Sequence, residues 1–164
     1  MPKVVIDDTK GLVQQTGTGI EVKSTGLVGL AYSSSTSLIR NGVGIAGALE
    51  VKLPAGALVL DAGIVVTTAI AISGNSDVSV KVGTAANGSE IAVAANLISA
   101  FTASAAGKAI SLDASGEGAA TLAMSANAVM HSSTERTIHI TVTNSANNIT
   151  AGACKGFVRY AVVK

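Results

Sequence analysis

Residues 53–72 read LPAGALVLDAGIVVTTAIAI, and this stretch decides the fold class. From Leu58 onward the even-numbered side chains are nearly all aliphatic, whereas the odd-numbered ones are smaller and partly polar. This two-residue period predicts a half-buried strand, because successive side chains of a strand point to opposite faces. A straight strand of this length would span ~50 Å at about 3.3 Å per residue, which is too long for a small domain. We therefore expect a bulge or a break near Gly63, where the missing Cβ eases a kink.

The same period recurs on the C-terminal side of this stretch. Valines alternate with polar residues over residues 77–82, and β-branched residues alternate over residues 137–143. We predict strands there, at residues 156–163, at residues 119–124 where the pattern is weaker, and at the short segments 4–6 and 20–22. Asn87-Gly88 predicts a tight turn, and residues 144–148 a polar loop. Many short strands with polar turns predict an all-β fold, a β-sandwich, of which the jelly roll is the commonest form at this chain size.

Two segments fit this pattern less well. Residues 91–102 allow a short helix, with Ser89 as its cap, as readily as a non-helical conformation. The first 45 residues are rich in Gly, Ser and Thr, which favours an arm over an independent domain. We therefore divide the chain into an N-terminal arm or extended loops, residues 1–45, and a β-sandwich domain, residues 46–164.

The charges of the chain are almost balanced. Its 164 residues contain 11 Lys and Arg against 10 Asp and Glu, a formal net charge of +1. Neutralisation of phosphates supplies most of the affinity of nucleic-acid-binding proteins, and it requires a basic excess. The composition therefore argues against direct nucleic-acid binding as the main function.

The chain is apolar overall, yet it shows no membrane-spanning pattern. Hydrophobic residues make up 48% and charged residues 13%, and the mean hydropathy is +0.53. The longest apolar run, residues 62–72, is shorter than the ~20 residues that a transmembrane helix needs. Asp7 and Asp8 stand where a signal peptide would need its apolar core. We expect a soluble protein that is synthesised in a cytoplasm and does not bind a membrane.

Aromatic residues are scarce. The chain has no Trp, and its whole aromatic set is Tyr32, Phe101, Phe157 and Tyr160. Sugar-binding and single-strand nucleic-acid-binding modules usually present aromatic rings on which ligands stack, so four scattered rings argue against both classes. The core must be built from Val, Ile, Leu and many Ala, each of which buries little area. We expect association with identical chains to supplement the modest stability of such a core.

Residues able to support catalysis or bind a metal are few and scattered. Only His131 and His139 could act as histidine bases, and we place the first in a polar loop and the second on the polar side of a strand. Cys154 is the single cysteine, which excludes an intrachain disulfide, and we expect it to be a small buried apolar residue.

The acidic and glycine-containing segments are better explained as turns. Asp7-Asp8 and residues 113–118 offer paired carboxylates for acid/base chemistry, and only residues 113–118 resemble a calcium loop, for which they have too few spaced carboxylates. Residues 82–88 contain two glycines but lack the Lys-Ser/Thr end of a phosphate loop. We predict no catalytic, cofactor-binding or metal-binding residue and expect that the protein is not an enzyme.

Two short segments carry a resemblance to a known family. Leu53-Pro54-Ala55-Gly56-Ala57 opens the long predicted strand, and residues 81–92, KVGTAANGSEIA, follow it. Together with the closing C-terminal strand, they resemble the small jelly-roll decoration (cement) proteins on the capsids of tailed bacteriophages. The resemblance covers about residues 53–163 and leaves the N-terminal segment unmatched.

The resemblance implies a structural role without catalysis or cofactors. It implies that the protein binds the outer surface of a capsid, with the major capsid protein as partner, and stabilises it. It also implies a homo-oligomer, often a trimer, on the virion surface after synthesis in the host cytoplasm. Two alternatives remain: a phage tail or baseplate component, and a carbohydrate- or receptor-binding jelly-roll module, against which the absence of Trp argues.

Overall fold

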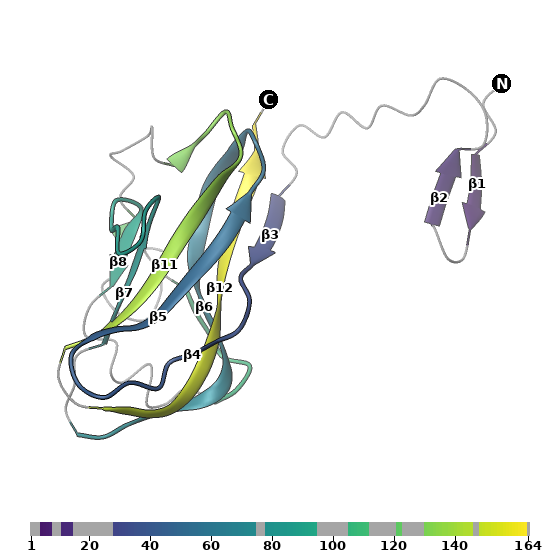
Figure 1. Ribbon diagram of the computed structural model, residues 1–164. Coiled ribbons are helices and arrows are strands. Elements are labelled where there is room, and N and C mark those ends of the chain that lie inside the picture. The colour runs from purple at the N-terminus through teal and green to yellow at the C-terminus, as the bar shows by residue number, and fades with distance from the viewer. Residues whose placement is uncertain are drawn as a thin grey trace.

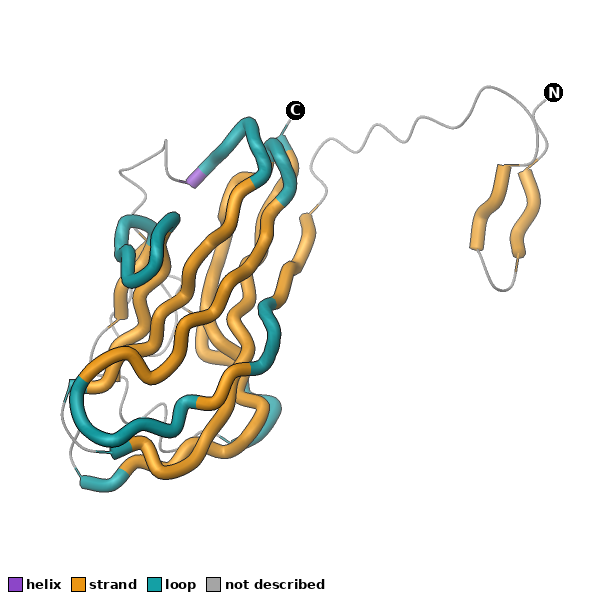
Figure 2. Tube along the Cα trace, viewed as in Figure 1, coloured by secondary structure: helices purple, strands orange, loops and turns teal. Residues whose placement is uncertain are grey.

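The computed structural model describes residues 4–7, 11–14, 28–74, 78–94, 105–111, 121–122, 130–145 and 148–163. Over these residues the protein is all-β, as predicted. Two antiparallel sheets pack face to face around an aliphatic core and form a β-sandwich (Figures 1 and 2). The finer designation as a jelly roll stays a prediction.

We call the two layers sheet I and sheet II. In spatial order, sheet I consists of β10 (Thr121–Leu122), β8 (Ala92–Ala94), β7 (Val78–Gly83), β11 (Arg136–Asn144) and β5 (Gly44–Leu53). Sheet II consists of β3 (Val28–Tyr32), β12 (Ile149–Val162), β6 (Ala57–Ile72) and β9 (Ala109–Ser111), with β4 (Thr36–Ser37) also paired to β12. A separate hairpin is formed by β1 (Val4–Asp7) and β2 (Gly11–Gln14). The edge strands β5 and β3 lie at the same margin of the sandwich (Figure 1).

The strands with the clearest alternation form the inner face of sheet I. The aliphatic side chains of this face are fully buried and comprise Val78, Val80, Val82, Ile138, Ile140 and Val142. Their polar neighbours in sequence point outward, where Ser79 and Thr143 lie directly opposite and their hydroxyls are 2.6 Å apart. The predicted strands at residues 77–82 and 137–143 are therefore confirmed.

The long predicted strand is β6, and its register with β12 shifts at four points, one of which lies near the position where a bulge was expected. Arg159 of β12 pairs with Asp61 while Tyr160 pairs with Val59, so Leu60 is the extra residue. A bulge changes which side chains point inward. Odd-numbered residues such as Val59 are therefore buried before it, and the even-numbered residues Ala62, Ile64 and Val66 are buried after it. The expectation of one aliphatic face along the whole strand was wrong for Leu58 and Leu60, which are only half-buried.

Gly63 has a different role from the predicted one. A Cβ at this position would collide with the Ile110 carbonyl oxygen and would lie 2.9 Å from Cε1 of Phe157. Gly63 therefore allows close approach of β9 and of an aromatic ring, while the bulge itself lies three residues earlier.

Residues 28–45, which the sequence assigned to an arm or extended loops, belong to the sandwich from Val28 onward. β3 pairs with β12 over its whole length, and β4 pairs with the same strand further along. Leu38 is fully buried, and its amide donates to the Gly152 carbonyl at 2.9 Å. An arm before Val28 stays a prediction.

Some predicted elements fall partly or wholly on residues outside the described ranges. Strand β8 occupies residues 92–94 of the segment for which a helix was considered, and residues 95–102 lie outside. The predicted strand at residues 20–22 and the acidic segment 113–118 also lie outside. Strands β1 and β10 confirm the predictions at residues 4–6 and 119–124 as far as they are described.

Candidate functional site

The described residues bring no ionisable side chains together as a chemical site. No group of three or more His, Cys, Asp or Glu side chains in this part of the chain could hold a metal ion. His139 lies on β11 opposite Glu50 of β5, with Nδ1 3.8 Å from Oε1. His131 is exposed in the predicted polar loop. Asp61 is buried, and its Oδ1 accepts a hydrogen bond from the Ser111 hydroxyl at 2.7 Å.

Cys154 is a buried apolar residue of β12, as the sequence predicted. Its side chain is fully buried within the core, and this desolvation raises the pKa of the thiol to about 12. A thiol reacts as a thiolate, so the raised pKa leaves Cys154 unsuited to act as a nucleophile or a metal ligand.

The loop over residues 83–90 is held together by its own carboxylate. Oε1 of Glu90 accepts hydrogen bonds from the amide and the hydroxyl of Thr84, both at 2.7 Å. These two bonds lower the pKa of Glu90. Asn87 adopts a φ of 61°, which confirms the predicted turn. The Thr84 amide that a phosphate would need is thus already bonded to an anionic side chain.

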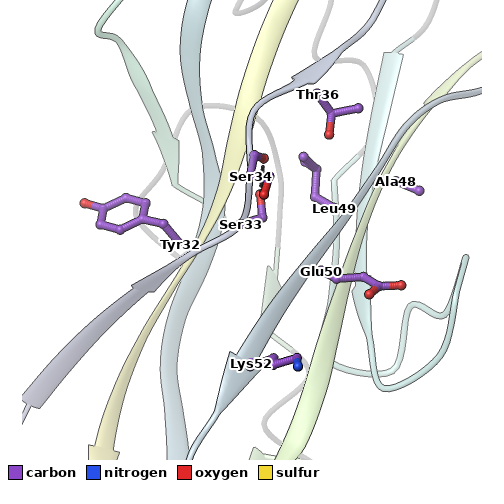
Figure 3. A pocket seen from close by; sticks show the side chains of 8 residues that line it. All are labelled: Tyr32, Ser33, Ser34, Thr36, Ala48, Leu49, Glu50 and Lys52. Atoms are coloured by element: carbon purple, nitrogen blue, oxygen red, sulfur yellow. Dashed lines mark hydrogen bonds between the residues drawn. The ribbon is translucent and has the colours of Figure 1, made fainter.

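A shallow groove lies at the margin where β3 and β4 face β5. Its volume is about 510 Å³, and its lining residues are Tyr32, Ser33, Ser34, Thr36, Ala48, Leu49, Glu50 and Lys52. Figure 3 shows the ring of Tyr32 pointing away from the other lining residues. A sugar that entered the groove would therefore find no aromatic face on which to stack.

The most buried hydroxyl of this groove already has structural partners. Ser33 Oγ donates to the Ser34 carbonyl at 2.8 Å and accepts from the Gly156 amide at 2.8 Å. The Ser33 amide in turn donates to the Gly156 carbonyl at 2.9 Å. Ser33 thus joins the end of β3 to β12.

The distinctive surface is an apolar margin formed by residues 28–45. Six of the seven large apolar side chains that are exposed in the described part of the chain lie in this segment, the seventh being Val163. They form two groups, which we call the β3 row (Val28, Leu30 and Tyr32) and the β5 loop group (Ile39, Val43 and Ile45). Concentrations of exposed apolar side chains of this kind mark interaction surfaces.

The β5 loop group is held in place by Arg40. The Arg40 side chain donates to the Val43 carbonyl from Nε at 3.2 Å and from Nη2 at 2.7 Å. It also donates to the Ile45 carbonyl from Nη1 at 3.2 Å. The backbone of Arg40 exchanges two hydrogen bonds with Ile149 of β12. The loop that carries these apolar side chains is therefore tied to both sheets.

Sequence reasoning missed this margin. The alternation of Val28, Leu30 and Tyr32 with Gly29 and Ala31 was a signal for a strand, but it is short. Its position at the edge of a sheet follows only from pairing with residues about 130 positions later.

Comparison with known proteins found no relative. No protein-family model, curated protein or solved structure matches this chain. No helix among the described residues is long and apolar enough to cross a membrane. The exposed apolar side chains of residues 28–45 are therefore the main basis for proposing a function.

Proposed function

We propose that this protein is a structural virion protein that binds the outer surface of a bacteriophage capsid and stabilises it as a decoration (cement) protein. In this proposal the partner is the major capsid protein, and the decoration protein acts as a symmetric homo-oligomer. The family resemblance of residues 53–57 and 81–92 suggested this role.

The observation that carries the proposal is the apolar margin of residues 28–45. Six of the seven large apolar side chains that are exposed in the described residues belong to residues 28–45, in the β3 row and in the β5 loop group. Among the described residues no group of three or more His, Cys, Asp or Glu side chains could hold a metal ion. The exposed apolar side chains support a role in assembly, because such side chains gain free energy when a partner covers them.

Capsid stabilisation by a small protein depends on many weak contacts made by identical copies. Each contact can be modest because a repeating surface binds many copies and the effects add by multivalency. A decoration protein must also stay folded when it is bound to the capsid. The long antiparallel pairing between β6 and β12 favours this. The loop fixed by Arg40 presents its apolar side chains with little ordering cost on binding.

The proposal is tested by adding the purified protein to empty capsids of the phage that encodes it and measuring their melting temperature. We expect the wild-type protein to bind and to raise this temperature. A variant that combines Ile39→Ser with Val43→Ser should bind more weakly, whereas the control Val163→Ser, also at an exposed apolar position, should behave as wild type.

Imaging of virions that carry the labelled protein distinguishes the alternatives. Label on the capsid surface supports the proposal, and label on the tail or baseplate overturns it in favour of a tail component. Capsids that melt identically with and without the protein would also overturn it. A glycan array with specific hits would instead support a receptor-binding module.

A further inference from the structure

The free side of β3 presents an ordered row of backbone hydrogen-bonding groups. The Ser33 amide points to β12, because it donates to the Gly156 carbonyl at 2.9 Å. Backbone groups alternate in direction along a strand, so the groups of Gly29 and Ala31 also face β12. Those of Val28, Leu30 and Tyr32 consequently face outward from the sheet. Among the residues that the structure describes, β3 is the terminal strand of sheet II and no strand pairs with its outer side.

This edge lacks the features that normally prevent strands from pairing with other molecules. Natural edge strands carry charges, prolines or bulges, or they are very short. β3 has five residues without charge or proline, and its register with β12 is continuous. Among the other described edges, β5 carries Glu50 and Lys52, while β9 and β10 have three and two residues.

The sequence of β3 is also complementary to itself. Val28, Leu30 and Tyr32 are large and exposed, and they alternate with the small residues Gly29 and Ala31. An antiparallel copy centred on Leu30 would place Val28 opposite Tyr32 and Leu30 opposite Leu30. Large side chains would then meet large ones, and every outward backbone group would find a partner.

We propose that β3 pairs in antiparallel fashion with β3 of a second copy of this chain, across a two-fold axis at Leu30. This pairing joins the two copies of sheet II into one continuous sheet. It is an isologous interface, so it closes as a dimer and does not extend into a fibre. It differs from the trimer that the family resemblance implies, and it stands independently of capsid binding.

Charge considerations favour a second copy over a partner of another kind. β3 carries no charged residue, so its edge offers no charge to which an oppositely charged partner could bind. On the neighbouring strand β12, Arg159 is directly paired with Leu30 of β3. The two Arg159 residues would be three strand spacings apart, about 14 Å. At that distance their repulsion is largely screened in physiological salt.

The dimer is tested on the full-length chain by sedimentation velocity over a range of concentrations. We expect the wild-type protein to dimerise reversibly. Leu30→Lys and Leu30→Glu should each be monomeric, because like charges would face each other across the axis. An equimolar mixture of the two variants should dimerise again, a rescue that requires residue 30 of one copy to contact residue 30 of the other. Ile39→Lys, with the same charge change at another exposed site, should dimerise as wild type.

Cross-linking gives an independent measurement in a Cys154→Ala background. Paired residues in this register have Cα atoms about 5.5 Å apart, which a disulfide can bridge. Leu30→Cys should therefore form a covalent dimer under mild oxidation, and the control Ile39→Cys should not. A wild-type monomer at every concentration, a trimer, or equal cross-linking of the two variants would overturn the dimer. Capsid melting measured with the Ile39→Ser and Val43→Ser double variant, which leaves β3 unchanged, reports separately on the proposed function.

Discussion

The ring of Tyr160 on β12 lies across Gly29, the residue directly paired with it on edge strand β3. A Cβ at Gly29 would lie 2.6 Å from Oη of Tyr160, so the ring occupies the space that a side chain would need. Phe157 has the same relationship with Gly63 on the other side of β12, where Cε1 lies 2.9 Å from a Cβ built on the glycine. Aromatic rings placed over cross-strand glycines compensate for their missing side chains.

Replacement of Tyr160 should therefore loosen the β3 edge. We expect Tyr160→Ala to lower the free energy of unfolding by about 2 kcal/mol, because the ring leaves both the core and the edge glycine. Tyr160→Phe keeps the ring and should cost less than about 0.5 kcal/mol. Equilibrium unfolding in urea measures both changes. Equal losses for the two variants would contradict the packing role of the ring.

Ser33 should be more important for stability than its exposed neighbour. Its Oγ is the acceptor for the Gly156 amide at 2.8 Å, within a buried part of β12. Ser33→Ala removes this acceptor and should cost about 1–3 kcal/mol, the range for a buried donor left without a partner. Ser34→Ala is the control, because Ser34 is exposed and its side chain can be shortened at little cost. Urea unfolding that gives the same value for both variants would exclude this role.

Arg40 should resist replacement even by lysine. Its planar group donates to the carbonyls of Val43 and Ile45 from three nitrogens, a geometry that a single ammonium cannot reproduce. We expect Arg40→Lys to cost about 1 kcal/mol and to make residues 41–45 more sensitive to limited proteolysis. Arg159→Lys, at an exposed position on β12, is the matched control. Identical cleavage rates in the two variants would show that Arg40 does not order the loop.

Cys154 should make the free energy of unfolding fall as the pH becomes alkaline. Burial raises the pKa of its thiol from 9.0 to about 12, so the folded protein favours the neutral form. The resulting stabilisation is complete below pH 9, and it is lost as the pH rises toward 12 because the unfolded thiol ionises first. Between these values the wild-type protein should lose stability faster than Cys154→Ala, a comparison in which all other residues are the same. Parallel pH profiles would contradict the prediction.

The same burial makes the thiol unreactive. At pH 8 we expect almost no modification of native Cys154 by a thiol reagent, and full modification after denaturation. Rapid modification of the native protein would show that the core around β12 opens under native conditions.

The sequence predicted the parts of the fold that depend on local alternation. Val78 to Val82 and Ile138 to Val142 are confirmed as inward-facing rows, because each segment is amphipathic by itself. A bulge in β6 was expected from strand length, and one of the four register shifts with β12 places an extra residue at Leu60, three residues from Gly63. Its position could not be predicted, because it depends on the register with β12.

Features that depend on distant pairing were not visible in the sequence. Tyr160 lies across Gly29 and Phe157 lies across Gly63 only because of the register between β3, β12 and β6, which the sequence does not reveal. The exposure of Val28, Leu30 and Tyr32 likewise depends on the place of β3 at the end of sheet II, as the described residues define that sheet. The same residues in a central strand would have lain within a paired sheet and suggested no interaction surface.

Leu38 and Ile39 test whether residues 28–45 belong to the folding unit. The two are adjacent and similar in size, yet Leu38 is 0% exposed and Ile39 is 62% exposed. Leu38 reaches from the β4 side of the margin to β5, where its Cδ2 would lie 2.5 Å from a Cβ built on Gly47. Leu38 therefore connects the edge of sheet II to the edge of sheet I.

We expect Leu38→Ala to cost about 3 kcal/mol, as for other leucines in a closely packed core. Ile39→Ala should change the free energy of unfolding by less than about 0.5 kcal/mol. Urea unfolding followed by circular dichroism measures both variants, and a single transition in each indicates that the margin unfolds with the sandwich. If Leu38→Ala were as stable as Ile39→Ala, residues 28–45 would rest on the surface without contributing to the core, and the apolar margin could not be a rigid interaction surface.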